Sequence, residues 1–417
     1  MGKLETKMMN RIFFIFFIFL SLQHATQAKT WIVKKGNSIA DAIKLAHAGD
    51  SIRVKKGVYH ERNLVIDKSL YLLGEGLPIL DGEGKYEVIS IKASNVTVNG
   101  FHIRNSGISS LIDLAGIKIY ESQNVQIINN LVTDAFFGIY VQYGKACLIK
   151  NNRIIAHGIE EQQSGNGIHC WYSSYMQIQN NQITGHRDGI YFEFVTHSVI
   201  RNNRSFRNLR YGLHFMFSNH DTYIANVFNN NGAGVAVMFS KQVNMFNNVF
   251  QQNWGDASYG ILLKEISDGK IQGNLFEKNT TGIYLEGVSR VAMTNNTFSA
   301  NGWGLKIQAS CSDIAINRNN FKNNTFDVST NGTLVLNNFN SNYWDKYEGY
   351  DLNRDKVGDV PFRPVSLFSI ILEKNPTSLI MFRSFISAMM DKTEKLIPSL
   401  TPEHLIDQTP RMNPIAL

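Results

Sequence analysis

A histidine and a methionine stand two residues apart in the run YGLHFMFSNH at residues 211–220. Side chains alternate along an extended chain, so a strand here sends Phe215 and Phe217 to one side and His214 and Met216 to the other. We expect the phenylalanines in the core, which leaves an imidazole and a thioether on the outward face. Together these groups suit copper(I) better than calcium, magnesium or manganese.

A repeat of about 22 residues determines where these side chains lie. Its first marker is a glycine that opens a short apolar run, at Gly116, Gly138, Gly167, Gly189, Gly212, Gly234, Gly260, Gly282 and Gly304. Its second marker is a pair of asparagines, at Asn129-Asn130, Asn151-Asn152, Asn180-Asn181, Asn202-Asn203, Asn247-Asn248, Asn295-Asn296, Asn319-Asn320 and Asn337-Asn338. Each unit is too short to bury its own hydrophobic face, so successive units must stack on one another.

Stacked units of this kind predict an all-β, single-stranded, right-handed parallel β-helix. Every strand then pairs with the equivalent strand of the next coil, about 4.8 Å away. The asparagines are expected to stack at a corner, where they tolerate left-handed backbone angles and bond between coils through their amides. One inward column is predicted to contain Ile139, Ile168, Ile190, Leu213, Val235, Ile261, Ile283 and Leu305.

The glycine register predicts which side chains share the outward face. Met216 and Met238 fall at the same position of adjacent coils, so their backbones are expected about 5 Å apart, with His214 close to both. His169 falls two coils before His214, about 10 Å away, as a second position along a path. The sequence therefore predicts a soft-metal site at Met216, Met238 and His214, with His169 nearby. An interface with another protein is the alternative explanation for such exposed side chains. In both flanking directions the outward residues, among them Lys118, look charged and ordinary.

The ends of the chain differ from the repeat. Residues 37–50 have helical periodicity and are expected to cap the amino-terminal end of a β-helix spanning residues 29–340. Residues 341–417 are expected to form a carboxy-terminal extension that docks a partner. It would contain an irregular loop at 342–364, a helix at 376–396 and an extended tail at 398–417 that depends on a partner for order.

Residues 1–28 resemble a secretory signal. Lys3, Lys7 and Arg11 precede an apolar run at residues 12–22, and small residues follow at 26–28. The apolar run is short for a membrane span, although an uncleaved anchor is the alternative. The remainder of the chain is mildly basic and contains no long run of Lys and Arg. This gives no reason to expect nucleic acid as a partner.

Three cysteines, Cys147, Cys170 and Cys311, do not resemble a disulfide framework. We expect them to be buried, free thiols rather than copper ligands.

The segment DLNRD at residues 351–355 resembles part of a calcium loop. Lys356 stands where a sharp-turn glycine is expected, and the closing glutamate is missing. A polar turn is the favoured interpretation, and a bound calcium ion is the alternative.

Several segments together resemble the nitrous oxide reductase maturation protein NosD family. They are GNGIHCW (165–171), RDGIY (187–191), RYGLHFMFSN (210–219), VMFS (237–240) and the late NYWDKYEGYD followed by GDVPFRP (342–364). The same order and the late segment, which β-helix proteins in general lack, make the combination specific. The resemblance covers nearly the whole chain after the signal.

The resemblance implies an exported, periplasmic accessory subunit without enzymatic activity of its own. It implies partners: an ABC-type permease with its ATPase, a copper-carrying lipoprotein as donor, and nitrous oxide reductase, whose copper centre is assembled. Contact with the membrane would come only through the permease. The proposed copper-handling residues of the family correspond to His169, His214, Met216 and Met238, with their individual roles unassigned.

Two alternatives come from other functional classes. Parallel β-helices commonly bind and cleave acidic polysaccharides, which requires several outward carboxylates. The best candidates are Asp188, Glu193, Arg187 and Arg210, and they do not form a column of paired acids. A purely structural binding protein, with the outward face as a docking surface, is the other alternative.

Overall fold

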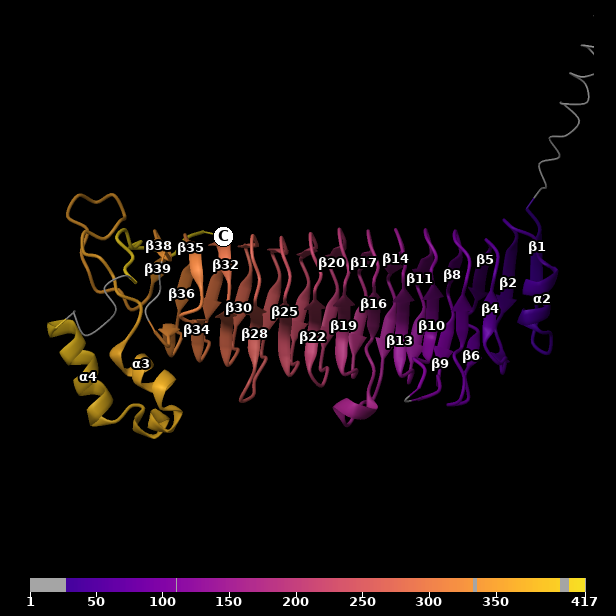
Figure 1. Ribbon diagram of the computed structural model, residues 1–417, viewed down its shortest axis with the longest axis horizontal. Helices are drawn as coiled ribbons and strands as arrows, with labels where there is room; N and C mark the ends of the chain where they lie inside the picture. Colours follow the sequence, from indigo (N-terminus) through magenta and orange to yellow (C-terminus); the bar gives the residue numbers. More distant parts are fainter. Residues whose placement is uncertain (1–27, 110, 333–335, 398–404, 417) are drawn as a thin grey trace, which may run out of the picture.

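The computed structural model describes residues 28–109, 111–332, 336–397 and 405–416, and it forms an elongated rod of stacked coils (Figure 1). The expected signal, residues 1–28, lies outside the described residues apart from Ala28. Three long parallel sheets make the walls of the rod, and each coil visits sheet C, sheet A and sheet B in turn. The fold is therefore the predicted right-handed parallel β-helix.

The three sheets contain fourteen, thirteen and twelve strands. Sheet A contains β1 (Thr30–Val33), β2 (Ser51–Lys55), β5 (Tyr71–Glu75), β8 (Thr97–Asn99), β11 (Gln126–Ile128), β14 (Leu148–Lys150), β17 (Gln177–Gln179), β20 (Val199–Arg201), β23 (Thr222–Ile224), β26 (Asn244–Phe246), β29 (Lys270–Gln272), β32 (Ser289–Thr294), β35 (Ser312–Asn317) and β38 (Asn338–Asn340). Sheet B contains β3 (Val58–Tyr59), β6 (Ile79–Asp81), β9 (His102–Arg104), β12 (Leu131–Thr133), β15 (Arg153–Ile155), β18 (Gln182–Thr184), β21 (Arg204–Phe206), β24 (Val227–Asn229), β27 (Val249–Gln251), β30 (Leu275–Glu277), β33 (Thr297–Ser299), β36 (Asn320–Lys322) and β39 (Tyr343–Trp344). Sheet C contains β4 (Leu64–Ile66), β7 (Ile89–Ile91), β10 (Ala115–Tyr120), β13 (Phe137–Gln142), β16 (Ile168–Trp171), β19 (Asp188–Glu193), β22 (Tyr211–Met216), β25 (Ala233–Met238), β28 (Tyr259–Lys264), β31 (Thr281–Glu286), β34 (Trp303–Ile307) and β37 (Phe326–Thr330).

The repeated glycines lie near the start of the sheet C strands, where successive coils approach too closely for a side chain. A Cβ atom on Gly212 would lie 2.7 Å from the carbonyl oxygen of Gly234, and the other glycines of the series have similar contacts. Only glycine fits this spacing without a backbone shift. The glycine repeat therefore fixes the register of sheet C.

The interior of the rod is a continuous apolar core. Every member of the predicted inward column, from Ile139 to Leu305, is fully buried. Aromatic rings stack along sheet B in the order Phe228, Phe250, Phe276, Phe298, Phe321 and Trp344, with centroid separations of 4.2–5.5 Å. Stacking of this kind adds to the stability that comes from burial alone.

The predicted asparagine stack divides its two tasks between the two residues of each pair. Asn202 adopts a positive φ of 54°, while Asn203 is buried and bonds both neighbouring coils. Its amide nitrogen donates to Ile178 O (2.8 Å) and Asn226 Oδ1 (3.0 Å). The predicted pairs Asn319-Asn320 and Asn337-Asn338 were wrong, because the stack continues there through Asn319, the first residue of its pair, and through Asn342, which lies outside both pairs.

A second asparagine stack, which the repeat analysis missed, lies between sheets B and C. It bonds in the same way from coil to coil, through Asn208, Asn231, Asn253, Asn279, Asn301 and Asn324. Buried asparagine amides therefore bond successive coils at both corners that flank sheet B. These bonds leave few backbone groups unpaired there.

The amino-terminal end is covered by α2 (Ile39–Leu45), within the segment predicted to be helical. Ser38 caps the helix by accepting from the backbone N–H of Asp41. Glu61 accepts from the backbone N–H of Ala40 at 2.7 Å, which ties the helix start to the first coils. Ile39 and Ile43 are buried against the core, so the helix closes this end of the apolar column.

The carboxy-terminal extension contains α3 (Leu367–Lys374), η2 (Pro376–Met381) and α4 (Phe385–Leu396), preceded by the expected irregular loop (Figure 1). The prediction of one helix over residues 376–396 was wrong. The helical conformation is interrupted between η2 and α4, where Arg383 has a φ of 61°. Ser384 then caps α4. The extension packs on the last coils through Phe368 and through an ion pair of 2.7 Å between Lys306 and Glu373.

Of the expected tail at 398–417, residues 398–404 and 417 lie outside the described residues. The described part, residues 405–416, is held by contacts with the chain itself. Asp407 is fully buried and accepts from the backbone and side-chain amides of Asn342 and from Trp344 Nε1, at 2.9–3.0 Å. It thus takes the position that the next asparagine of the first stack would occupy. Ile415 bonds Asn320 through its backbone N–H and C=O.

Candidate metal centre

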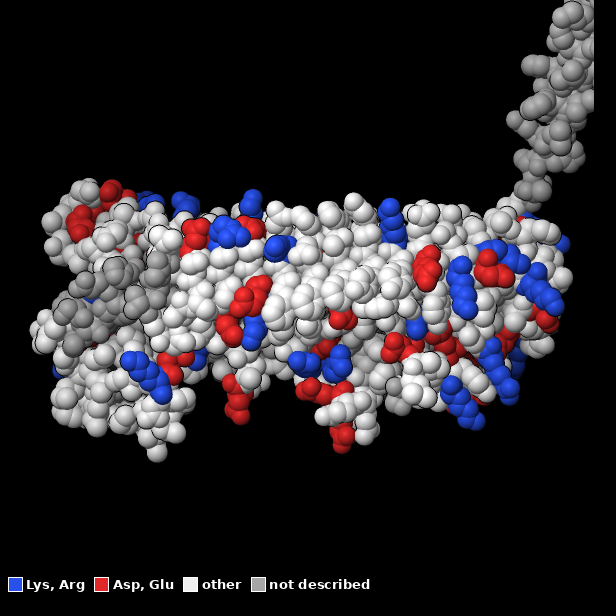
Figure 2. Space-filling model, viewed as in Figure 1, with Lys and Arg blue, Asp and Glu red and all other residues white. Residues whose placement is uncertain are grey.

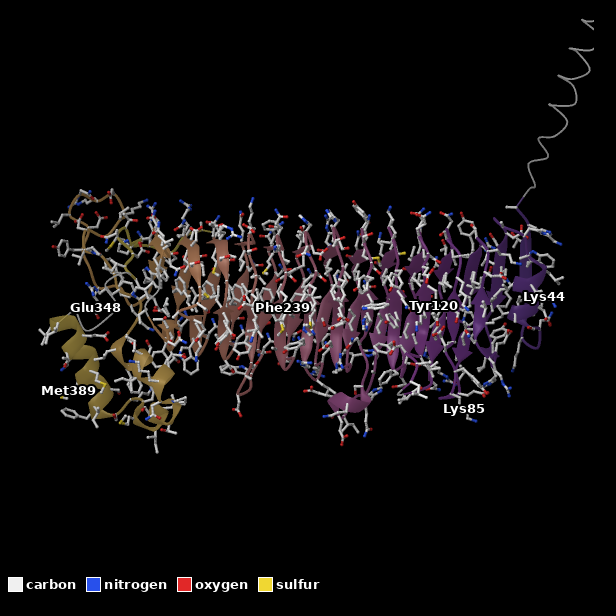
Figure 3. The ribbon with its side chains drawn as sticks, viewed as in Figure 1. Lys44, Lys85, Tyr120, Phe239, Glu348 and Met389 are labelled. Atoms are coloured by element: carbon white, nitrogen blue, oxygen red, sulfur yellow. The ribbon has the colours of Figure 1, made fainter. Side chains whose placement is uncertain are left out.

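Two columns of side chains run along the outward face of sheet C, perpendicular to its strands. The first, the imidazole column, consists of Ser90, Lys118, Tyr140, His169, Tyr191 and His214. The second, the thioether column, lies two residues further along each strand and consists of Gln142, Trp171, Glu193, Met216, Met238 and Lys264. Figure 3 labels Tyr120, the register partner of Gln142 at the amino-terminal end of this second column, and Phe239, which follows Met238 on the chain.

Met216 and Met238 are register partners on β22 and β25, as predicted. Both are half-buried. Each strand ends at its methionine because the next residue, Phe217 or Phe239, adopts a positive φ of 51° or 52°. Ser218 and Ser240 then donate their hydroxyls to the methionine carbonyls at 3.0 and 2.8 Å. The register places the two Cα atoms about 4.8 Å apart, close enough for flexible thioethers to converge on one ion.

His214 is almost completely buried, with 4% of its surface exposed, although it belongs to the outward face. Its Nδ1 lies 3.6 Å from the carboxylate of Asp188, which is itself buried and accepts the backbone N–H of Tyr211 at 3.2 Å. The rings of Tyr191 and Tyr211 flank the imidazole at centroid distances of 4.9 and 4.8 Å. A carboxylate beside Nδ1 favours a proton there, which leaves the lone pair of Nε2 for a ligand.

His169 lies two coils before His214, with Tyr191 between them, as predicted. Its ring contacts Tyr140 and Tyr191 at centroid distances of 4.5 and 4.7 Å. Burial, with a smaller contribution from Arg187, lowers the pKa of His169 to about 3. The imidazole is therefore neutral, the form that binds metals, throughout the physiological range.

Buried polar atoms without a protein partner gather around these two histidines. Among the described residues, seven such atoms lie on β16, β19 and β22 or just before these strands: Asn166 Oδ1, His169 Nε2, both ring nitrogens of His186, Arg187 Nε and both ring nitrogens of His214. A buried polar atom without a partner costs about 1–3 kcal/mol. Their concentration in three adjacent coils marks a place where a ligand would supply the missing partners.

The imidazole column continues toward the amino terminus as a buried polar cluster that the sequence analysis missed. Lys118 is buried, donates to the carbonyl of Asp113 at 3.1 Å and lies 4.7 Å from the ring centre of Tyr140. Glu87 is buried as well, accepts from Tyr120 at 3.1 Å, and has its pKa raised by burial. The expectation that the flanking outward residues are ordinary surface charges was therefore wrong on this side.

Phe217 does not enter the core, contrary to the prediction. It adopts a positive φ of 51° directly after β22, and this turn of the backbone points its side chain to the surface. There it joins a stack of partly exposed rings, one from each of five successive coils: Tyr143, Tyr172, Phe194, Phe217 and Phe239. In the view of Figure 2, a band with few charged side chains runs along the middle of the rod, above a group of Lys, Arg, Asp and Glu side chains.

The three cysteines are free and buried, as predicted. Burial raises the pKa of each thiol, and that of Cys170 most strongly. The thiolate form that binds metals is therefore disfavoured.

The late loop uses its carboxylates for its own backbone. Asp351 accepts the backbone N–H groups of Asp355 (3.1 Å) and Lys356 (2.8 Å), and Lys356 has a φ of 68°. Across the described ranges, no cluster of three or more His, Cys, Asp or Glu side chains is arranged to hold a metal ion. The loop therefore has the features of the polar turn.

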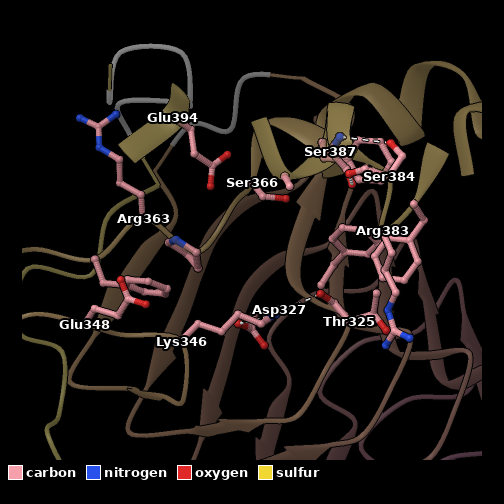
Figure 4. A pocket seen from close by; sticks show the side chains of 16 residues that line it. Thr325, Asp327, Lys346, Glu348, Arg363, Ser366, Arg383, Ser384, Ser387 and Glu394 are labelled. Atoms are coloured by element: carbon pink, nitrogen blue, oxygen red, sulfur yellow. Dashed lines mark hydrogen bonds and ion pairs between the residues drawn. The ribbon is translucent and has the colours of Figure 1, made fainter. Parts of the chain in front are cut away.

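A cavity of about 460 Å³ lies where the carboxy-terminal extension meets the last coils (Figure 4). Its floor includes Asp327, which is buried and paired with Lys346 at 3.3 Å, and its far wall includes Ser384 and Ser387 at the start of α4. Four phenylalanines, Phe326, Phe362, Phe368 and Phe382, line it together with charged residues that include Glu348, Arg363, Arg383 and Glu394. The cavity has no set of soft ligands, so it is separate from the metal centre.

Known proteins match this chain in sequence. Residues 155–349 match the model of a family described as "Periplasmic copper-binding protein (NosD)". The chain is 25% identical over 380 residues to "Probable ABC transporter binding protein NosD" of Stutzerimonas stutzeri, a match that covers 86% of each chain. It is 26% identical over 346 residues to the protein of the same name from Pseudomonas aeruginosa, with 78% of this chain and 79% of the relative covered.

Solved structures match the fold. A family 28 exopolygalacturonase of Yersinia enterocolitica superposes with a TM-score of 0.55 at 12% identity, covering 75% of this chain and 78% of the enzyme. The A-module of the mannuronan C-5 epimerase AlgE6 of Azotobacter vinelandii gives 0.51 at 12% identity, covering 72% and 92%. At such identities the likeness concerns the fold alone.

The three-sheet rod and its outward columns define a right-handed parallel β-helix protein with a candidate metal centre on one face. The chain is similar to the NosD family over residues 155–349, and this matched segment contains all four predicted site residues, His169, His214, Met216 and Met238. Within the described ranges, the helices are too short or too polar to cross a lipid bilayer.

Proposed function

We propose that this protein is a periplasmic accessory protein for the maturation of nitrous oxide reductase. It would assist assembly of the reductase copper centre, together with an ABC-type transporter, by binding copper(I) transiently on the outward face of sheet C. One observation supports the proposal most directly: the unpartnered Nε2 of His214 lies on the strand that also presents Met216, the register partner of Met238.

The ligand set fits a carrier rather than a permanent site. Met216 and Met238 are neutral, flexible and half-buried, and His214 supplies one nitrogen whose ring is oriented by Asp188. Thioether and imidazole ligands favour copper(I) over harder ions. Because the proposed site has few ligands and none of them is charged, the ion would be bound weakly enough to be released. His169, two coils away, would hold the ion at a second position along the imidazole column.

The partners of the proposal follow from the family. The relatives in Stutzerimonas stutzeri and Pseudomonas aeruginosa are named as ABC transporter binding proteins. The proposed partners are therefore an ABC-type permease with its ATPase, a copper-donating lipoprotein and nitrous oxide reductase. The carboxy-terminal extension, which projects beyond the last coils in Figure 1, is the proposed docking element.

We infer that the protein is not a polysaccharide-cleaving enzyme, despite the enzymes that share its fold. Asp188 is fully buried and already contacts His214, Arg187 and the backbone of Tyr211. A glycosidic oxygen cannot reach it without rearrangement of these groups. Glu193 is then a single half-exposed carboxylate, whereas acid–base cleavage of a glycosidic bond uses two.

Anaerobic titration of the mature protein with copper(I), in competition with a chelator, tests the site. The double variant Met216→Ala/Met238→Ala is expected to lose at least about tenfold in affinity. Met389→Ala, which removes an exposed methionine of α4, serves as the matched control and is expected to bind like the wild type. Equal affinity of all three proteins would remove the proposed site, and cleavage of polyuronates by the wild type would favour the enzyme.

A further inference from the structure

Two exposed histidines stack at the corner that follows sheet C. His197 and His220 occupy equivalent positions of adjacent coils, and both have a left-handed backbone, with φ values of 55° and 60°. Their ring centroids are 4.7 Å apart and the planes differ by 12°. Tyr175 of the preceding coil stacks on His197 at 5.3 Å. The identical backbone conformation makes the two Cα–Cβ bonds nearly parallel.

We propose that His197 and His220 form a second metal site, for a divalent late first-row ion such as Cu²⁺, Zn²⁺ or Ni²⁺. Imidazole nitrogen is a preferred ligand of these ions. In the part of the chain that the structure describes, no protein hydrogen bond engages either ring. The site does not depend on the proposed function, because it uses none of the residues assigned to copper(I).

Binding of one ion by both histidines requires the two stacked rings to turn toward each other. Metal–nitrogen distances of about 2.0–2.1 Å place two nitrogens of a tetrahedral site about 3.3 Å apart. Because the rings of His197 and His220 are nearly parallel, equivalent nitrogens lie about as far apart as the centroids, 4.7 Å. Each nitrogen must therefore move inward by about 0.7 Å. Because an imidazole lone pair lies in the plane of its ring, both rings must also rotate out of the parallel stack, which changes of the side-chain torsion angles allow at exposed residues. Solvent completes the coordination.

The surroundings contain little that competes for the ion. Gln242 takes the next position of the column and has a neutral side chain. Asp221, which follows His220, is fully buried and accepts the backbone N–H of Ser198 at 2.8 Å, so its carboxyl faces the interior. Lys241 belongs to the next coil, and its positive charge is exposed and screened by salt.

The two sites differ in the ion they prefer. The methionine pair offers soft sulfur, which selects copper(I), whereas the histidine pair offers two nitrogens, which suit divalent ions. Met216 and His220 begin and end one five-residue segment, so the two sites would lie on the same edge of the rod. The structure thus assigns separate binding positions to the reduced and the oxidised ion.

The test is titration of the mature protein, purified without a histidine tag, with Cu²⁺ and separately with Zn²⁺ in competition with a chelator. The variants are His197→Asn and His220→Asn, because asparagine tolerates the left-handed backbone and is present at the equivalent corner position 124. Each is expected to weaken binding at least about tenfold and to remove nitrogen coupling from the Cu²⁺ paramagnetic resonance spectrum.

Two controls make the outcome decisive. Tyr175→Asn, at the preceding position of the same column, removes a stacked ring but no ligand, and it is expected to leave the affinity within about twofold. Met216→Ala/Met238→Ala is expected to retain Cu²⁺ and Zn²⁺ binding. Wild-type affinity in both histidine variants, or an equal loss in the tyrosine variant, would overturn the site. Neither result bears on copper(I) at the methionine pair.

Discussion

The Nδ1 atom of His214 lies 3.6 Å from the carboxylate of Asp188, and both side chains are buried beneath the outward face of sheet C. The two residues come from adjacent coils, and each is also part of a strand whose register is fixed by neighbouring glycines. A carboxylate that orients an imidazole is a recurrent partner of metal-binding histidines.

Asp188→Asn is expected to weaken copper(I) binding by about tenfold, because the neutral amide no longer stabilises the required ring orientation. The amide oxygen can still accept the N–H of Tyr211, so the fold is expected to persist. Glu193→Gln, which neutralises a carboxylate on the same strand, is the control. An unchanged copper(I) affinity in Asp188→Asn would show that Asp188 does not position His214.

His169 predicts a loss of stability in acid. Its folded-state pKa of about 3 is below the ordinary value of 6.5, so the unfolded chain takes up a proton first as the pH falls. The free energy of unfolding therefore decreases below pH 6.5, by at most about 1.4 kcal/mol per pH unit from this residue. His169→Gln should flatten urea unfolding measurements between pH 6.5 and 4, whereas the exposed His157→Gln should not. Parallel pH profiles for His169→Gln and wild type would contradict the assignment.

Asp221 predicts the opposite dependence on pH. Burial raises its pKa well above 3.8, so the folded protein holds a proton that the unfolded chain releases. The stability cost of this residue therefore grows as the pH rises above about 4. Asp221→Asn retains an oxygen for the N–H of Ser198 and is expected to stabilise the protein by about 1–3 kcal/mol at pH 7. The gain should shrink toward pH 4 in thermal unfolding, and a gain independent of pH would refute this account.

The first asparagine stack predicts a large cost for a single deletion. Asn226→Ala removes bonds to Ile200 and Asn248, and it removes the Oδ1 atom that accepts from both the backbone N–H and the side-chain amide of Asn203. We expect a loss of about 3–5 kcal/mol in chemical unfolding. Asn202→Gly is the control, because glycine adopts its positive φ readily, and it should change stability by less than about 1 kcal/mol. Similar losses in both variants would show that the amide bonds between coils are not the cause.

Asp407 predicts that the end of the tail stabilises the last coils. Asp407→Ala leaves the amides of Asn342 and the Nε1 of Trp344 without their acceptor, at a cost of about 2–4 kcal/mol. Hydrogen exchange should then increase in β38 and β39 while β22 stays protected. Uniform exchange along the rod would contradict this local role.

The sequence predicted those features that depend on register. Glycines and asparagines recur because coils approach closely and turn sharply at fixed positions, so the pairing of Met216 with Met238 and the order of His169, Tyr191 and His214 followed directly. Burial was harder to predict. Alternation of faces holds only while the backbone is extended, and the left-handed turn at Phe217 ends it.

Contacts between distant segments left no periodic signal in the sequence. Glu87 and Tyr120 meet across two adjacent coils, and neither belongs to a recognisable motif. Asp407 joins the asparagine stack from a segment 65 residues away from Asn342. A long apolar stretch predicted a single helix at the carboxy terminus, whereas packing of Phe382 on Phe326 favours the break at Arg383.

Successive coils are separated by a constant rise of about 4.8 Å, so distances along the rod follow from the number of coils. Five steps of sheet C separate β22, which bears His214 and Met216, from β37, on which the carboxy-terminal extension packs, a distance of about 24 Å. Insertions in the turns do not alter this length, since only whole coils add to it. An ion bound at His214 and Met216 would therefore lie at a fixed distance from a partner that docks on the extension, and only the gain or loss of a complete coil would change that distance.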